Sequence, residues 1–385
     1  MKALVFHKPK DVRVEDLPDP RIEAPTDVIV RVTTTTLCGS DLHIYNGYLP
    51  QPRPMALGHE FMGVVEAVGA DVRRAKVGDR VLQPFCISCG SCWFCARQWP
   101  THCEQSNPKF YGPDGDILKD KGAGLYGYTD LYGGHQGGQA EYVRVPFADA
   151  NVWKVPDGVP DEKVLFLTDI LPTGWAAVDQ GRVEPGDVVV VFGCGPVGIM
   201  AMKSAWVKQA ARVIAVDPLA YRRDLARNLA CAEVIDPEAG DAIEQIRALT
   251  GGRGADVAID AVGMEVDRTM LQKAADVLHL QAGSAKVVDL CYRAARRGGR
   301  VSIVGVYGTA YDNFPLGRFF DKGLTVWAGQ APVHRYLPEL ARMVLDGRLV
   351  TDDVITHRMK LADLPRAYQV FNDKQDGMLK AVFTP

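Results

Sequence analysis

Cysteines cluster in one short stretch of the chain. Cys89, Cys92, Cys95 and Cys103 lie within fifteen residues of one another. Four thiolates at this spacing can close a tetrahedral zinc site, and four protein ligands leave no open position, so we predict a structural zinc. Free loop cysteines are the alternative, but free Cys is usually buried and scattered, whereas these lie among Gly, Ser and Arg. Cys86 could be a spare thiol or an alternative ligand, and we favour a spare thiol.

A second group of possible zinc ligands lies nearer the N-terminus. CGSDLH (38–43) is followed by GHE (58–60). Cys and His suit a catalytic zinc, which needs three protein ligands and an open position. A Cys and a His about twenty residues apart are more often unrelated core residues. By itself, the pair therefore does not establish a metal site.

A glycine-rich hexapeptide, GCGPVG (193–198), follows an apolar strand-like run and opens a helix-like segment. Its glycines would let the backbone approach a pyrophosphate, and the helix N-terminus offers free N–H groups. Asp217 ends the next strand-like run, where a carboxylate would bind the adenosine ribose hydroxyls of NAD and repel a 2′-phosphate. A glycine turn kept only for packing would explain neither the helix nor the acid. The expected NAD-binding residues of the loop are Gly193, Gly195, Pro196, Val197 and Gly198.

The elements that must position these groups change character along the chain. Up to about residue 155 the runs 27–35, 60–69, 79–84 and 140–146 are β-type and bounded by turn residues, which indicates a mostly-β, barrel-like domain. From about residue 160, apolar strands alternate with amphipathic helices, which indicates an α/β domain with a doubly wound parallel sheet. About forty residues separate two of its strands, ADVAID and GRVSIV, so this crossover carries an insertion, placed near 279–297.

Composition bounds the remaining possibilities. The chain has 385 residues, enough for two domains, and 47% of them are hydrophobic. It has no apolar run long enough to cross a bilayer and no signal-peptide pattern at the N-terminus, so we expect a cytoplasmic protein without a membrane partner. A net charge of −3 disfavours a nucleic-acid partner. Nine cysteines in that compartment are expected to stay reduced.

The motifs together resemble one family. CGSDLH, GHEFMGVVEAVG, the four-cysteine lobe, GGQAEYVRVP, DILPTGW, GCGPVG and AVD follow one another as in the zinc-containing medium-chain alcohol dehydrogenases. The resemblance implies a GroES-like catalytic domain (1–160 and 318–385) with a structural-zinc lobe (86–106). It also implies a Rossmann NAD-binding domain (161–317) and an active site in the cleft between the two domains.

The resemblance also implies a catalytic zinc. Cys38 and His59 match the first two ligands of this metal, and Asp169 matches the third. Glu60 matches a carboxylate near the metal that can transiently coordinate it. Asp41 matches the acid that orients the ligand histidine, as zinc-bound imidazoles generally require. The expected cofactors are therefore two zinc ions per chain and NAD.

Further roles follow from the same resemblance. Ser40 matches the hydroxyl that bonds the substrate oxygen, and His43 matches the exposed end of the proton relay. Thr173 would lie near the nicotinamide and Arg222 near the adenosine ribose. Lys380 matches a basic position that can reach the pyrophosphate, although a solvated strand residue is an equally good interpretation of it.

The expected substrate is a small primary alcohol or aldehyde. The AVD motif, the insertion, AGQAPVHRY and an aspartate as third ligand resemble most the glutathione-independent formaldehyde dehydrogenases and formaldehyde dismutases. CGSDLHIY also suits polyol and threonine dehydrogenases, so a secondary alcohol is the alternative. A non-catalytic NAD-binding relative is a third possibility, set aside because the ligands and the relay are kept. The resemblance implies a homodimer or homotetramer.

Overall fold

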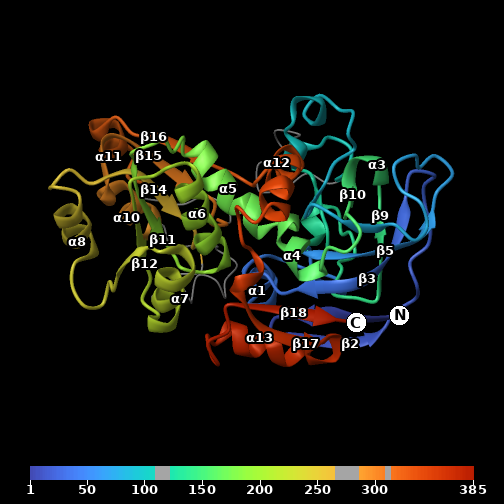
Figure 1. The fold of residues 1–385 in the computed structure, drawn as a ribbon. Coiled ribbons are helices and arrows are strands. Elements are labelled where there is room, and N and C mark those ends of the chain that lie inside the picture. The colour runs from blue at the N-terminus through green and yellow to red at the C-terminus, as the bar shows by residue number, and fades with distance from the viewer. Residues whose placement is uncertain (109–121, 265–285, 308–313) are drawn as a thin grey trace. The chain divides into compact units, whose positions relative to one another are not determined.

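The computed structural model describes residues 1–108, 122–264, 286–307 and 314–385, and its chain divides into two compact units (Figure 1). The first unit contains residues 1–172 and 332–385, and the second contains 173–331. The predicted boundaries were 160/161 and 317/318. The two boundaries between the units differ from these, and each has a structural reason. Helix α4 (Asp161–Leu165) packs on strands of the first unit, and β16 (Thr325–Ala328) pairs with a strand of the second.

The first unit is built on a seven-stranded sheet. Its strands lie in the order β10 (Trp153–Lys154), β6 (Arg80–Leu82), β5 (Phe61–Val68), β3 (Val28–Thr36), β18 (Lys380–Thr384) and β17 (Ile355–Lys360), and β9 (Tyr142–Val145) also pairs with β3. Strand β3 reads VIVRVTTTT, a run of β-branched residues that favours a pleated strand. A core of buried valines with Phe61 and Tyr126 lies against this sheet.

Smaller sheets complete the first unit. One joins β2 (Asp11–Asp16), β1 (Lys2–Lys8) and β4 (Met55–Ala56), and another joins β7 (Cys86–Ile87) to β8 (Gly124–Leu125). The mostly-β architecture predicted for this part of the chain is confirmed.

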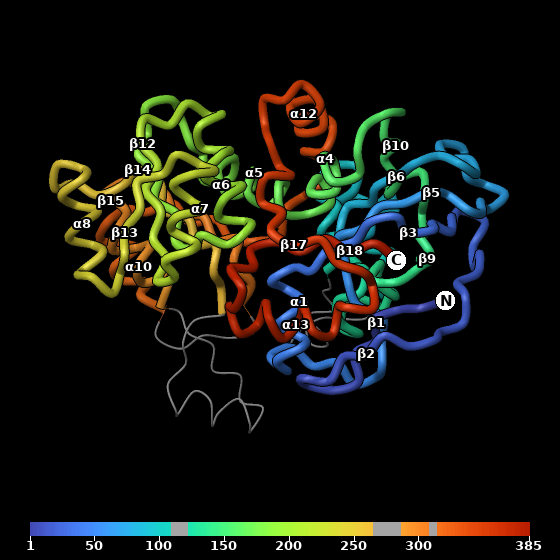
Figure 2. The backbone as a smooth tube through the Cα atoms, turned by 60° about the horizontal axis from the view of Figure 1, so that its bottom comes forward, coloured from blue at the N-terminus to red at the C-terminus, as the bar shows by residue number. Residues whose placement is uncertain are grey.

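The C-terminal segment returns to this first unit. Helices α12 (Val333–Leu345) and α13 (Leu364–Asn372) precede β18, which pairs antiparallel with β3 through Val382–Thr36 and Phe383–Thr35. The tube trace in Figure 2 shows the red C-terminal strand beside the blue N-terminal ones. A strand from the end of the chain therefore lies beside one from its beginning.

The second unit is a six-stranded parallel sheet. The order is β13 (Glu233–Ile235), β12 (Arg212–Val216), β11 (Val188–Phe192), β14 (Ala255–Asp260), β15 (Ala295–Ile303) and β16. The first strand of the unit lies near the middle, and the chain moves outward first on one side and then on the other. This order defines a doubly wound Rossmann sheet, and the predicted fold class is confirmed.

Helices cover the sheet in two pairs. Helices α6 (Pro196–Val207) and α7 (Ala220–Ala230) contact each other over β11 and β12, whereas α8 (Ala242–Leu249) contacts α10 (Lys286–Ala294). Because parallel crossovers are right-handed, reversing the direction of winding moves the later helices to the opposite face. Within the predicted insertion, α10 occupies Lys286–Ala294, and Ala295 begins β15. The part of the insertion before Lys286 lies outside the described residues.

Membrane-spanning helices are absent from the parts of the chain that the structure describes, since none is both long and apolar enough.

Candidate active site

Strand pairing brings two distant motifs together. Strand β3 ends at Thr36 and β5 begins at Phe61, and the two run antiparallel with Thr35 opposite Phe61. The N–H of Thr36 also donates to the carbonyl of Glu60 at 3.1 Å. The residues just after β3 must therefore lie beside those just before β5. This pairing places Cys38 next to His59.

The third predicted ligand, Asp169, lies in a separate helical segment. Asp169 ends the 3₁₀ helix η4 (Phe166–Thr168), and the Thr168 carbonyl accepts a 3.0 Å hydrogen bond from the N–H of Phe85. Asp169 Oδ2 lies 3.3 Å from His59 Nε2 and 3.7 Å from Cys38 Sγ. One ligand atom from each of Cys38, His59, Glu60 and Asp169 lies within 4.8 Å of the other three.

The chemistry of this group fits a zinc ion. Cys38, His59, Glu60 and Asp169 are all buried, and Glu60 Oε2 has no hydrogen-bond partner among the residues that the structure describes. Burial, together with the carboxylates of Glu60 and Asp169, raises the pKa of the Cys38 thiol to about 11. Burial opposes a charge on His59, yet Asp41 and Cys38 raise its pKa well above the usual value. Acidic groups thus outnumber cations here, and a divalent ion with S, N and O ligands would balance them.

Asp41 lies beside the imidazole that it is predicted to orient. It is fully buried at the start of α1 (Asp41–Tyr45), and its Oδ1 lies 3.3 Å from His59 Nδ1. Its Oδ2 accepts hydrogen bonds from the N–H of Cys38 at 3.0 Å and from Gln139 Nε2 at 3.1 Å. Tyr368 in turn donates to Gln139 Oε1 at 2.9 Å. Asp41 therefore turns Nε2 of the imidazole toward the other ligands.

Sequence reasoning missed Gln139 and Tyr368. Gln139 lies within the GGQAEYVRVP motif, which was used only as a family marker. Tyr368 lies on the apolar face of a C-terminal helix, where nothing in the sequence separates it from the core residues beside it.

Lys380 forms a buried ion pair with Glu60. Its side chain is buried, and its Nζ donates to Glu60 Oε1 at 2.6 Å and to the Leu37 carbonyl at 3.0 Å. Burial disfavours this ammonium ion, but Glu60 raises its pKa above the usual value. Burial excludes the alternative interpretation of Lys380 as a solvated strand residue, and its assignment to the cofactor pyrophosphate stays a prediction. Its charge holds Glu60 at the edge of the metal centre.

The relay residues differ in their surroundings. Ser40 is partly exposed, with its Oγ 3.8 Å from Cys38 Sγ. His43 was expected to be the exposed end of the relay, but it is buried on α1 with only 4% of its surface exposed. Its Nδ1 lies 3.1 Å from the Tyr128 hydroxyl, and the Tyr128 ring packs edge-on against His59 at 5.9 Å. Tyr128, which sequence analysis missed, thus links His43 to the metal centre.

The four clustered cysteines form a second metal-type group. One sulfur from each lies within 4.8 Å of the others. Backbone N–H groups of Cys89 and Cys92 donate to the sulfurs of Cys103 and Cys89, both at 3.3 Å. A hydrogen bond from Cys95 lowers the pKa of Cys103 to about 4. This set fits a structural zinc.

Cys86 is not part of the four-cysteine group. Its Sγ instead lies 3.8 Å from Nδ1 of His334, on α12, and the other ring nitrogen of that histidine lies 2.9 Å from Asn151 Oδ1. The choice of a spare thiol over an alternative ligand therefore agrees with the structure.

The glycine loop has the backbone that a dinucleotide needs. Gly193 adopts φ +95°, and a Cβ on Gly198 would lie 1.9 Å from the Gly193 carbonyl oxygen, so no side chain fits there. Helix α6 starts directly after Gly195, with Pro196 in its first turn and Val197 next. The N-terminus of this helix therefore lies at the glycine turn, the position that binds a pyrophosphate in dinucleotide-binding folds.

Asp217 follows β12 directly and is hydrogen-bonded to this loop. It is buried, and its two carboxylate oxygens accept hydrogen bonds from the N–H groups of Cys194 and Leu219, each at 2.8 Å. Arg222 lies nearby, with Nη1 4.0 Å from the point that a Cβ on Gly195 would occupy, and its Nε donates to the Tyr221 hydroxyl at 3.1 Å. Thr173 is the first residue of the second unit, within α5 (Ile170–Gln180).

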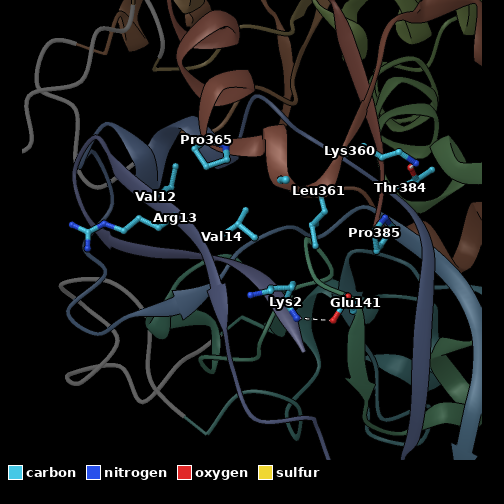
Figure 3. A pocket seen from close by; sticks show the side chains of 11 residues that line it. Lys2, Val12, Arg13, Val14, Glu141, Lys360, Leu361, Pro365, Thr384 and Pro385 are labelled. Atoms are coloured by element: carbon cyan, nitrogen blue, oxygen red, sulfur yellow. Dashed lines mark hydrogen bonds between the residues drawn. The ribbon is translucent and has the colours of Figure 1, made fainter.

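A groove of about 600 Å³ elsewhere on the first unit contains none of the predicted site residues (Figure 3). Two of its basic side chains are already neutralised, since Lys2 pairs with Asp16 and Arg13 with Asp11. The groove offers no cluster of metal ligands or nucleophiles. We therefore assign it no part in the chemistry.

The fold and the two metal-type groups define a zinc-binding oxidoreductase with a dinucleotide cofactor. Residues 24–157 match the family described as alcohol dehydrogenase GroES-like domain, and residues 196–280 match the zinc-binding dehydrogenase family. The chain belongs to the zinc-type alcohol dehydrogenase family.

Individual relatives agree with this assignment. An uncharacterized zinc-type alcohol dehydrogenase-like protein of Bacillus subtilis is 41% identical over the full length of both chains. A glutathione-independent formaldehyde dehydrogenase of Pseudomonas aeruginosa is 34% identical, covering 96% of this chain and 94% of its own. The solved alcohol dehydrogenase TADH from Thermus sp. ATN1 has a TM-score of 0.85 and 35% identity, covering 100% and 99% of the two chains.

The two groups predict the zinc content of three variants. Wild-type protein should hold two zinc ions per chain by elemental analysis. Cys38→Ser should stay folded with one zinc and lose more than about 100-fold in activity, because a ligand of the catalytic metal is gone. Cys92→Ser should lose the other zinc and more than about 4 kcal/mol of unfolding free energy, since a structural metal contributes directly to folding.

Cys86→Ser is the matched control, because Cys86 lies beside the lobe without contributing to the four-sulfur group. It should retain both zinc ions and near-wild-type activity. Full activity in both Cys38→Ser and Cys92→Ser would contradict the assignment of the two sites.

Proposed function

We propose that the enzyme interconverts small primary alcohols and aldehydes, formaldehyde included, using NAD(H). The observation that carries the proposal is the buried group of Cys38, His59 and Asp169, with the Ser40 hydroxyl close to the Cys38 sulfur. A catalytic zinc held there would act as a Lewis acid toward the substrate oxygen. An aspartate as third ligand and the 34% identical formaldehyde dehydrogenase support the choice of substrate.

The chain's own residues then have defined tasks. Ser40 would hydrogen-bond the substrate hydroxyl, accepting its proton as it gives up its own toward His43, which is hydrogen-bonded to Tyr128. Asp41 fixes the imidazole of His59. Glu60, neutralised by Lys380, supplies a carboxylate at the edge of the centre without adding a net charge. The buried position of His43 makes it an internal proton acceptor rather than a surface one.

Substrate choice is tested with a panel of alcohols and aldehydes. We expect kcat/KM for formaldehyde and short primary alcohols to exceed that for sorbitol and threonine by at least about tenfold. A difference of that size corresponds to about 1.4 kcal/mol of transition-state binding. NADH absorbance measures the rates, and a reading taken anaerobically before NAD is added shows whether the purified enzyme retains its cofactor.

Sorbitol or threonine with a kcat/KM above every primary alcohol tested would replace the proposal with a polyol or threonine dehydrogenase. Absence of turnover with every substrate, despite two bound zinc ions, would contradict both.

We further propose that NAD is preferred to NADP. Asp217 lies at the end of β12, beside the glycine loop, where the adenosine ribose of a dinucleotide is expected. Charge-assisted hydrogen bonds from a ribose diol to this carboxylate would contribute about 1.5–3 kcal/mol each. A 2′-phosphate would instead meet a like charge. Arg222 is directed to Tyr221 and the glycine loop, consistent with a place at the adenosine side, and Thr173 is assigned to the nicotinamide side.

Replacing Asp217 tests this preference. Wild-type enzyme should favour NAD by more than about tenfold in kcat/KM, and Asp217→Ser should narrow or invert that ratio, because the repulsion of the 2′-phosphate is removed. Asp224→Ser is the control. It removes the same charge, from an exposed residue of α7 that is paired with Arg227. Equal use of NADP by the wild-type enzyme would show that Arg222 controls this pocket.

We also propose a homo-oligomer joined through the edge of the second sheet. Strand β16 ends the strand order, and in the described part of the chain no strand pairs with its outer side. Phe320, Leu316 and Val326 nearby are exposed by 87%, 69% and 40%. An open edge with apolar neighbours is a ready surface for pairing with a second copy.

Sedimentation velocity tests the oligomer. The wild type should sediment as a dimer or tetramer, and Val326→Lys should shift it toward smaller species, because a buried lysine at the edge would be unpaired. Val350→Lys, an exposed position in the first unit, is the control. A monomeric wild type would contradict the proposal. We place the enzyme in the cytoplasm, consistent with nine cysteines that form no disulfide among the described residues.

A further inference from the structure

Asp260 is a fully buried acid that the proposed chemistry does not use. It is the last residue of β14, and its Oδ1 accepts hydrogen bonds from the N–H groups of Val262 at 2.9 Å and Gly263 at 3.0 Å. Its Oδ2 accepts the hydroxyl hydrogen of Tyr307 at 2.5 Å. A buried carboxylate is costly unless it is hydrogen-bonded, and here three donors from two loops meet that need.

The backbone of Asp260 ties the same two loops together. Its carbonyl accepts from the N–H groups of Val304 and Gly305, both at 3.0 Å, just beyond β15. One residue thus anchors the turn after its own strand and the turn after the neighbouring strand. Its side chain holds the first turn directly and the second through Tyr307.

The two turns are packed backbone to backbone. The N–H of Met264 donates to the Val306 carbonyl at 2.9 Å. A Cβ on Gly305 would lie 2.2 Å from the N of Gly263, and a Cβ on Gly263 would lie 2.5 Å from both N and O of Val306. No side chain fits between the turns. Their relative position is therefore set by backbone contacts and by the Asp260 carboxylate.

These turns lie at the reversal point of the sheet. Strands β11 and β14 are neighbours, and the chain winds outward from them in opposite directions, which is where open α/β sheets bind their ligands. The turn after β14 also touches the cofactor loop. The N–H of Ala261 donates to the Phe192 carbonyl at 3.0 Å, and a Cβ on Gly193 would lie 2.7 Å from Val262 Cγ2.

Other residues lie on the side of the reversal point where the adenosine half of the cofactor is expected. Asp217 lies at the end of β12, on the far side of β11 from β14. A dinucleotide whose pyrophosphate crosses the Gly193–Gly198 turn must place its other half over β14 and β15. The turns that Asp260 anchors are therefore on the nicotinamide side.

We propose that Asp260 and Tyr307 are positioning residues that hold the turns after β14 and β15 in the shape that receives the nicotinamide half of the cofactor. The inference rests on the proposed NAD(H)-linked function. The adenosine half depends on the glycine loop and Asp217, which have no hydrogen bond to Asp260 among the described contacts. Different residues therefore face the two halves of the cofactor, and the two sets meet where Val262 packs on Gly193.

The test compares NADH with ADP-ribose, which lacks the nicotinamide. Tyr307→Phe and Asp260→Asn should weaken NADH binding by about tenfold, the effect of about 1.4 kcal/mol, while ADP-ribose affinity stays within about twofold. Isothermal titration calorimetry measures both constants on the zinc-loaded protein. KM for the cofactor should rise with the NADH dissociation constant.

Asp256→Asn is the matched control. Asp256 lies near the other end of the same strand, where it accepts from the N–H of Val188 at 2.8 Å and from Arg296 Nε at 2.5 Å. Its replacement should lower the stability of the same sheet and leave both affinities unchanged. Tyr307→Phe removes only one hydroxyl and keeps the test decisive if Asp260→Asn does not fold.

The outcomes separate this inference from the proposed function. Equal losses of NADH and ADP-ribose affinity in Tyr307→Phe, or no loss of either, would overturn the positioning role. Selective loss of NADH affinity in Asp256→Asn would overturn it too, because the effect would then follow general loss of stability. A wild-type protein that binds ADP-ribose but not NADH would instead contradict the proposed NAD(H) chemistry.

Discussion

The first unit depends on balancing charge in a small buried volume. Asp41, Glu60, Asp169 and the Cys38 thiol lie together, almost without access to water. Each carboxylate in such surroundings would cost several kcal/mol if it were left unpaired. Lys380 neutralises Glu60, and His59 lies between the other two acids. The negative charge that Lys380 and His59 leave unbalanced lies where a divalent cation would bind.

The sheet supplies this balance by bringing chain ends together. Cys38 follows β3, Glu60 precedes β5 and Lys380 begins β18, and these three strands are neighbours in one sheet. Antiparallel pairing of β3 with both of the others fixes the register to within one residue. A slip by one residue would turn each side chain to the opposite face of the sheet. The register of three strands therefore sets the composition of the metal centre.

Sequence reasoning succeeded where the chemistry is local. The four-cysteine lobe, the glycine loop and the alternation of strands and helices are each written in a few consecutive residues, and the family resemblance then paired Cys38 with His59. The ion pair of Glu60 with Lys380 joins residues 320 positions apart. No spacing in the sequence could indicate it, and the resemblance related Lys380 only to the cofactor.

Burial was the other quantity that the sequence could not supply. The resemblance implied an exposed His43, and no residue near it in the chain indicates Tyr128, which contacts it from a distant loop. Asp260 was read as the end of an apolar strand, since its partners are backbone amides and a tyrosine on another turn. Such contacts depend on which turns meet at a sheet edge, and this becomes known only with the fold.

The return of the C-terminal strand has a consequence for the order in which the chain can fold during synthesis. Residues 173–331 are contiguous and are complete before β18 leaves the ribosome, so the second unit can fold while the first is unfinished. The first unit lacks the cation for Glu60 until Lys380 has emerged. Until then its central sheet also exposes the edge of β3 that β18 later covers. A nascent chain stalled before residue 380 would carry a finished nucleotide-type domain joined to an open β-sheet, a species prone to pairing with other chains.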